Sequence, residues 1–418
     1  MNHPSESRSS FSDSSYQYEY HHTFHNHSII TMIFLFLLAL FAPSNAQQLL
    51  DLKSFKGGGD TKIDATGPYS IYVSASSDAA ETLKQVYVKT SDNQIKSLYD
   101  LKNNKYLQDS GFLQPFQVDK EAYVSTVLSD QDLSALKGFL YVTTAQQLAN
   151  SNGFFVYDVV TAETVNIGGV QTSDNCTVVL LNSNFDTLPW MSTTISSWSQ
   201  SADAAASVSI YEGIPTDSDE KANSQFFSNP AVLPNGDTVY FTNVEKFSVS
   251  LGAFYLKVYK GVEIVIEPAY TEIDGSQTSA FTTTGLYMKP FNQADKKITV
   301  LTARDPQYNG TTGANVVGSV PVTATVSLSE NDGDQHSGIK LNPADQIRGF
   351  STSAIGQNFT IESNGATAGE FFVQYFVIQD AQVIGQTTAG PFETTTKSTA
   401  FTTFFTSLLV PVIGARLL

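Results

Sequence analysis

The sequence predicts an all-β protein made of tandem antiparallel β-sandwiches. Short runs rich in Val, Ile, Thr, Tyr and Phe alternate with turn residues along the chain, which is the pattern of packed strands. Helical periodicity is weak, and only residues 77–87 and 130–138 favour short helices. A glycine-led strand also recurs three times at near-constant spacing, which indicates repeated domains.

The recurring strand marks the end of each predicted domain. It reads GFLYV from Gly138, GAFYLKV from Gly252 and GEFFVQYFV from Gly369, and these glycines are 114 and 117 residues apart. We expect each copy to be a core strand. We also expect its glycine to relax the backbone at the turn that enters the strand.

Three further strands precede each closing strand. The first ones read YSIYVS, CTVVLL and KITVLT, the middle ones VYVK, VSIYEG and VSLSENDG, and the last ones AYVST, TVYFTN and NFTIE. Turn-rich stretches such as SDN, LPNGD and SNGA separate them. This order predicts sandwiches over residues 52–147, 152–263 and 268–381. Two domains, or one large sandwich, are the alternatives.

The N-terminal region predicts a signal peptide over residues 1–46. Nine apolar residues, Ile33 to Phe41, precede the small-residue site Ser44-Asn45-Ala46, and this run is too short to span a bilayer. The segment before Met32 has one Arg and no Lys, so it lacks the usual basic start of a signal peptide. We therefore expect translation to begin at Met32, with residues 1–31 a gene-model extension.

The C-terminal region predicts a glycosylphosphatidylinositol (GPI) anchor. A Thr-rich stalk over residues 382–399 leads into a hydrophobic tail over residues 400–418. Ser398 begins a small-residue triplet suited to lipid attachment, and a mixed spacer of about ten residues follows it. Arg416 interrupts the tail, so a membrane-spanning helix and a freely secreted protein stay as alternatives.

Sequons and charge agree with an extracellular glycoprotein. Sequons at Asn175, Asn309 and Asn358 are candidate glycosylation sites. The net charge is -17 and no Lys/Arg-rich stretch stands out, which excludes a nucleic-acid partner. The single cysteine, Cys176, excludes an intramolecular disulfide. Its strand-like surroundings favour a buried inert thiol over intermolecular pairing.

The sequence predicts no enzyme, cofactor or metal. After the signal peptide the chain has one histidine, His336, so it lacks the ligands of a His/Cys zinc site and a supported catalytic triad. A hydrolase that uses a carboxylate pair is the remaining catalytic alternative. The acidic stretch with Glu330, Asp332 and Asp334 offers oxygen ligands for calcium, but its spacing does not fit the EF-hand pattern, and a solvated turn is the favoured explanation.

The two tryptophans are the candidate ligand contacts. Trp190 and Trp198 lie in the polar stretch DTLPWMSTTISSWSQS, which suggests a loop. An aromatic ring on a loop can stack on a sugar or anchor a protein partner. The alternative is that both rings cap a sandwich core.

The strand order and the closing strand resemble those of the CUB-type sandwich, in particular the CUB-like domains of nematode secreted and cell-surface proteins. The resemblance spans residues 55–380 and implies a jelly-roll-type sandwich that recognises an extracellular protein or carbohydrate, in nematodes often in intestinal defence. Ordinary CUB domains carry one or two disulfides, and this chain departs from that pattern.

We therefore expect a non-catalytic recognition or adhesion protein. We expect the C-terminal lipid anchor to hold it on the extracellular face of the plasma membrane, or else the protein is secreted. Host defence is one process in which it could act. The alternative function is structural, as a surface-coat or extracellular matrix component.

Overall fold

The computed structural model describes most of the chain between residues 47 and 379, and all of these residues belong to one compact unit. The described ranges are 47–107, 111–149, 153–167, 175–186, 188–201, 205–216, 224–275, 277–278, 282–302, 310–332, 335–342, 349–352 and 355–379. The predicted signal peptide, stalk and tail, with Ser398, lie outside them, as does Asn309. Within these ranges, no helix is long and apolar enough to cross a membrane.

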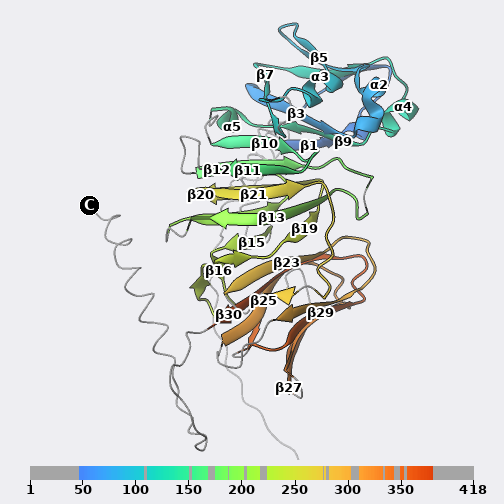
Figure 1. Cartoon of the computed structure of the whole chain (residues 1–418). Helices are drawn as coiled ribbons and strands as arrows, with labels where there is room; N and C mark the ends of the chain where they lie inside the picture. The colour runs from blue at the N-terminus through green and yellow to red at the C-terminus, as the bar shows by residue number, and fades with distance from the viewer. Residues whose placement is uncertain are drawn as a thin grey trace, which may run out of the picture. The chain divides into compact units, whose positions relative to one another are not determined.

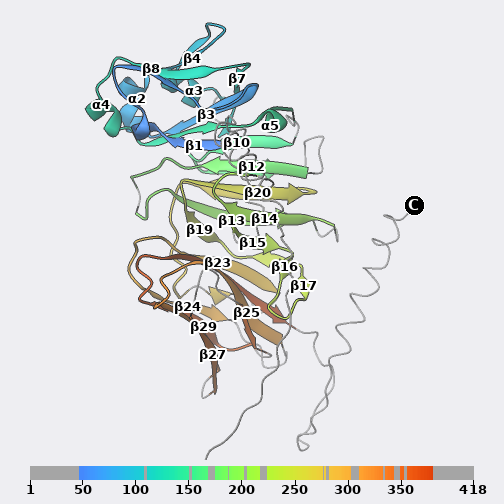
Figure 2. The same cartoon turned by 180° about the vertical axis from the view of Figure 1, so that it is seen from behind.

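The first block consists of two four-stranded sheets (Figures 1 and 2). One sheet has the order β1-β9-β3-β7, and the other has the order β2-β8-β4-β5. Apolar side chains from both sheets form a single core cluster. Its strands are β1 (Gln48–Asp51), β2 (Gly59–Lys62), β3 (Tyr69–Ala75), β4 (Val86–Thr90), β5 (Ile95–Ser97), β7 (Phe116–Val118), β8 (Ala122–Thr126) and β9 (Gly138–Val142).

Short helices cover the ends of this block. The two predicted helices are confirmed but are shorter than expected: they are α2 (Ala80–Leu83), which follows the 3₁₀ turn η2 (Ser77–Ala79), and α4 (Asp130–Ser134). Two helices were not predicted, α3 (Leu98–Lys102) and α5 (Ala145–Ala149), and a further 3₁₀ turn, η1, spans Leu52–Ser54. Both α3 and α4 begin with a serine capping box, which stabilises a helix of only five residues.

The second block packs a six-stranded sheet, β15-β14-β20-β12-β10-β6, against a four-stranded one, β11-β21-β13-β19, and adds the hairpin β16-β17. Its strands are β6 (Phe112–Leu113), β10 (Phe154–Asp158), β11 (Glu163–Ile167), β12 (Asn175–Leu181), β13 (Ser192–Gln200), β14 (Ser207–Glu212), β15 (Gln225–Asn229), β16 (Ala231–Val232), β17 (Thr238–Val239), β19 (Phe247–Ser250), β20 (Ala253–Tyr259) and β21 (Val262–Glu267).

The third block pairs two five-stranded sheets, β18-β23-β30-β25-β28 and β22-β24-β29-β26-β27. Its strands are β18 (Asn243–Val244), β22 (Gln277–Thr278), β23 (Thr283–Lys289), β24 (Lys297–Thr302), β25 (Gly310–Ser319), β26 (Thr325–Asp332), β27 (Gln335–Leu341), β28 (Phe350–Thr352), β29 (Asn358–Asn364) and β30 (Glu370–Gln379). The prediction of an all-β sandwich protein is therefore confirmed.

The recurring strands are interior strands of their sheets. They form β9, β20 and β30, and each pairs with a neighbour on both sides. The expected role of the glycine is right only for Gly138, which has a φ of +139°. At Gly252 and Gly369 the need is space, because a Cβ would lie 2.5 Å from Phe139 Cζ and 2.6 Å from Val320 Cα.

Two strands join sheets across the predicted block boundaries. Strand β6 belongs to the first block in sequence but pairs with β10, and β18 belongs to the second block but pairs with β23. The middle strands hold different places in the three blocks, because β14 pairs directly with the closing strand β20, whereas β4 and β26 belong to the sheet opposite their closing strands. The boundaries 52–147, 152–263 and 268–381 remain predictions.

Candidate functional site

The six-stranded sheet has one buried face and one face that is only partly covered. Along β12, Cys176, Val178 and Leu180 point into the sandwich core, as alternate residues of a strand do. Asn175 and Thr177 lie on the opposite, outer face. Strand β20 pairs residue by residue with β12 on one side and with β14 on the other. All three strands therefore place alternate residues on the same outer face.

The first block covers one end of this outer face. Val179 and Tyr255 are buried there against Tyr72 and Tyr141 of β3 and β9. Tyr72 and Tyr141 stack on each other with ring centroids 6.1 Å apart, and Tyr211 stacks on Tyr255 at 4.9 Å. The other end of the face stays open and forms a pocket.

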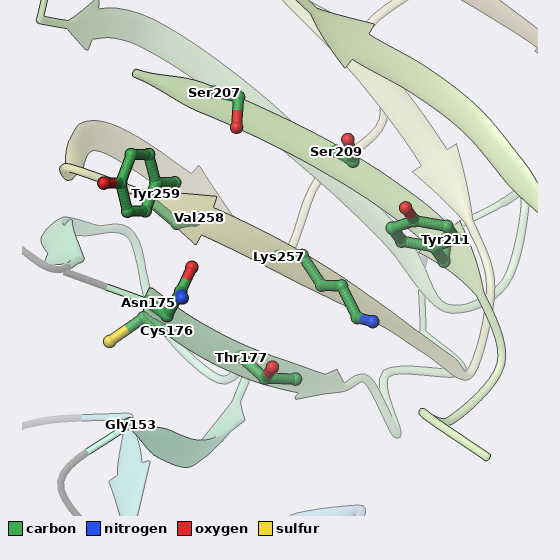
Figure 3. Close-up of a pocket in the computed structure, with 10 residues that line it drawn as sticks. All are labelled: Gly153, Asn175, Cys176, Thr177, Ser207, Ser209, Tyr211, Lys257, Val258 and Tyr259. Carbon is green, nitrogen blue, oxygen red and sulfur yellow. The ribbon is translucent and has the colours of Figure 1, made fainter. Parts of the chain in front are cut away.

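The open end is a shallow pocket of about 420 Å³, within the size range of small-molecule sites. Figure 3 shows polar groups from three neighbouring strands along it. The lining residues on the outer face are Asn175, Thr177, Ser207, Ser209, Tyr211, Lys257 and Tyr259. Hydroxyl groups, an amide, an ammonium group and two phenol rings together suit a polar ligand with an apolar face, such as a sugar.

These pocket residues were not predicted from the sequence, although a signal for them exists. In β14, Ser207 and Ser209 alternate with the buried Val208 and Ile210. In β20, Lys257 interrupts an otherwise apolar strand. Such alternation predicts that each strand has a polar face. Only the pairing of β14 with β20 shows that their polar residues lie side by side on one face of the sheet.

A second exposed feature is the loop between β12 and β13, here called the aromatic loop (residues 182–191, of which 187 is not described). Leu188 is 78% exposed and Trp190 is 57% exposed at its tip. The ring of Phe185 lies 6.2 Å from that of Trp190, and Lys137 Nζ lies 5.9 Å from the Phe185 centroid. The loop therefore presents apolar rings beside a cation.

Hydrogen bonds from two asparagines fix this loop. The buried Asn182 donates through Nδ2 to the backbone oxygen of Ser192 at 3.0 Å, and its Oδ1 accepts from the backbone N–H of Asn184 at 2.8 Å. Asn184 Oδ1 in turn accepts from the N–H of Asp186 at 2.9 Å. Met191 donates its N–H to Asn184 O at 2.7 Å and adopts a φ of +55°. A non-glycine residue held in that region often marks a ligand-binding segment.

The other tryptophan packs against the core. Trp198 lies on β13, half-buried, with its ring 5.5 Å from that of Phe227 and its Nε1 donating to Gln200 Oε1 at 3.1 Å. It lies on a different strand from the aromatic loop, beside a bulge at which Ser197 has a φ of +53°. Its role as a ligand contact stays a prediction.

A buried carboxyl group links the first and second blocks. Asp158, at the end of β10, is fully buried, and its Oδ1 accepts from Ser74 Oγ of β3 at 2.5 Å. Within the described ranges, Oδ2 has no hydrogen-bond partner. Burial raises the pKa of Asp158 to about 6, although Ser74, Lys105 and Lys102 oppose that shift.

The predicted glycosylation sites differ in exposure. Asn175 is exposed at the start of β12. Asn358 is half-buried at the start of β29, and its Oδ1 accepts from Asn331 Nδ2 at 2.8 Å. Thr360, in the sequon of Asn358, is buried, whereas Thr177, in the sequon of Asn175, lines the pocket. The glycosylation of these sites stays a prediction.

The candidate groups for chemistry are far apart in the fold. Cys176 is buried in β12, and burial raises its pKa, whereas His336 lies exposed on β27 in another sheet and contacts Asn331. Glu330 of the proposed calcium loop points inward and accepts from Thr352 and from the Gly356 N–H. Across the part of the chain that the structure describes, no group of three His, Cys, Asp or Glu side chains could hold a metal ion.

Comparison with known proteins gives a family and distant matches among the solved structures. The model of a family described as "Glycoprotein: Transmembrane glycoprotein" matches residues 66–413. A solved structure described as "The Triple Jelly Roll Fold and Turret Assembly in an Archaeal Virus" shares 10% identity over 80% of this chain and 89% of that one, with a TM-score of 0.19. That score is too low to say more about this chain. No curated protein matches the chain.

Proposed function

Because the chain belongs to the transmembrane glycoprotein family, we propose that it is an extracellular surface glycoprotein that recognises a ligand without catalysis. The recognised class is an extracellular protein or a carbohydrate, and the contact is the aromatic loop around Trp190. Recognition of microbial surfaces in host defence is one setting that this chemistry suits. Sandwich domains of the CUB-like type, which serve such recognition, are compatible with the observed sheets.

The exposure of Trp190 on a fixed loop is the observation that carries this proposal. Trp190 is 57% exposed and leaves apolar surface in water, and a ligand can cover that surface at little entropic cost when the loop is already ordered. The two asparagines and the Met191 backbone bond provide that order. Exposed aromatic anchors of this kind dominate binding energy in many interfaces.

Binding can be tested with a printed array of neutral and acidic glycans and with intact bacterial cells. We expect saturable binding by the full chain and a loss of about tenfold or more in affinity for Trp190→Ala, as for a contact worth about 1.4 kcal/mol. The matched control is Phe291→Ala, because Phe291 is 56% exposed between β23 and β24, outside the aromatic loop, and its loss should leave affinity unchanged. Self-association without any ligand would instead support a structural coat protein.

The membrane attachment that we propose is a GPI anchor at Ser398. A tag placed after Gln47 on the expressed chain allows its release from intact cells to be followed. Phosphatidylinositol-specific phospholipase C should release it, and Ser398→Leu should reduce that release. Retention on the treated cells would favour a spanning tail, and protein in the medium without the enzyme would favour secretion.

A further inference from the structure

We propose that the outer-face pocket binds a glycan that is attached to Asn175 of the same chain. In this arrangement the first N-acetylglucosamine residue packs on the ring of Tyr259, with Ser207 on the neighbouring strand beside it. The glycan then completes the outer face of the six-stranded sheet and stabilises the fold. This inference rests on the extracellular route of the proposed function, but not on recognition by Trp190.

Strand register places the acceptor next to the ring. Asn175 lies directly opposite Tyr259 in the antiparallel pair of β12 and β20. Ser207 of β14 lies opposite Tyr259 on the other side. Side chains that face each other across antiparallel strands have Cβ atoms about 4.5–5.5 Å apart. Figure 3 shows Asn175 and Tyr259 on neighbouring strands of this pocket. A sugar attached to Asn175 therefore begins within reach of the Tyr259 ring.

The sequon is oriented for modification. Residues Asn175 and Thr177 are two positions apart on one strand, so both face outward while Cys176 between them is buried. In the transfer step, Nδ2 of Asn175 forms a bond to C1 of the sugar and loses one proton. The bond between C1 and the oxygen of a lipid diphosphate donor breaks, and the lipid diphosphate leaves with that electron pair.

The lining chemistry fits an N-acetylhexosamine. The hydroxyls of Ser207, Ser209 and Thr177 can each donate and accept hydrogen bonds. Lys257 Nζ lies 5.8 Å from the centroid of the Tyr211 ring, so it can donate to hydroxyl oxygens further along the glycan. Tyr259 offers an apolar ring for the hydrophobic face of the sugar. The third-block sequon lacks this setting, since Asn358 is half-buried and Thr360 is buried.

The first measurement is the occupancy of Asn175. The full chain is expressed in a cell that performs N-glycosylation, and mass spectrometry of the peptide that contains Asn175 reports the modification. We expect a glycan on most molecules. Asn175→Gln removes the acceptor, and Thr177→Ser keeps the sequon, so only the first variant should lose the glycan.

The second measurement tests whether the sugar contacts the pocket. We expect Tyr259→Ala to lower Tm by about 2–4 °C more in the glycosylated chain than in the Asn175→Gln background. Tyr259→Phe keeps the ring and should preserve the difference. Tyr87→Ala is the matched control, since Tyr87 is an exposed strand tyrosine of β4 outside the pocket, and it should lower Tm equally in both backgrounds.

An endoglycosidase that leaves a single N-acetylglucosamine isolates the contribution of the first sugar. We expect the trimmed protein to retain its Tm, because the proposed contact with Tyr259 is made by this first N-acetylglucosamine. An unmodified Asn175 in a chain displayed on the cell surface overturns the inference and leaves the extracellular location intact. A glycan at Asn175 that shows no coupling to Tyr259 also overturns it. A chain that never reaches the secretory route overturns both the inference and the proposed function.

Discussion

The junction at Asp158 predicts that the protein loses stability as pH rises from about 4 to about 6. The carboxyl group is fully buried between the first and second blocks, with Oδ1 held by Ser74. Only its neutral form suits this position, because burial disfavours the charge. Lys102 and Lys105 are the charged groups that act on it, and both favour the ionised form. Even so, the pKa stays raised.

The magnitude follows from the difference between the two pKa values. In the unfolded chain the group titrates near 3.8, and in the folded protein it titrates at about 6. Two pKa units correspond to about 3 kcal/mol of unfolding free energy. Below pH 3.8 Asp158 is protonated in both the folded and the unfolded protein, so its full contribution to the free energy of unfolding is present. Between the two values only the unfolded chain ionises, so stability falls until the folded pKa is passed.

The Asp158→Asn variant removes this titration and keeps a neutral side chain of the same shape. We expect the unfolding free energy of the variant, measured by urea denaturation at each pH, to rise relative to the wild type by about 3 kcal/mol between pH 4 and pH 7. Other titrating groups cancel in that comparison. A difference that is constant with pH, or that shrinks as pH rises, would refute the assignment of a raised pKa to this junction.

Three further predictions concern residues of the third block. Burial and Glu212 raise the pKa of Glu370 to about 7. The Tm of the wild type should therefore fall as pH rises from 5 to 8, and the Glu370→Gln variant should show a smaller fall in the same thermal scans. Phe372 stacks on Phe226 at 4.3 Å, and Phe372→Ala should cost about 3–5 kcal/mol in urea unfolding. Gly369→Ala should cost about 1–3 kcal/mol in the same assay, because the new methyl group meets backbone rather than a flexible side chain.

The strands could be predicted because their signal is local. The closing strands from Gly138, Gly252 and Gly369 are runs of aromatic and aliphatic residues long enough to identify, and all three proved to be interior strands. Strand β6 could not be predicted, because Phe112 and Leu113 make only a two-residue strand. Its place beside β10 depends on how two blocks pack.

The candidate sites depended on pairing, which a single sequence does not reveal. Lys257 and Ser207 each look like an ordinary polar residue of a half-buried strand, and only the register puts them on one face. Asp158 looks like a polar residue at the end of a strand, yet the first block covers it completely. Trp190 was a candidate because a tryptophan in a polar stretch is unusual, and that signal is local.

The interface between the first and second blocks also supports the aromatic loop. Ser74 Oγ lies 2.5 Å from Asp158 Oδ1 and 3.1 Å from the hydroxyl of Ser183, the residue that follows Asn182 in the loop. Phe139 of the first block packs over Gly252, beside the sulfur of Met191. The surface around Trp190 is therefore shaped by both blocks and by the residues that bury Asp158. Covering one end of the six-stranded sheet thus has two consequences, because it fixes the loop at that end and leaves the end with Asn175 open for a glycan.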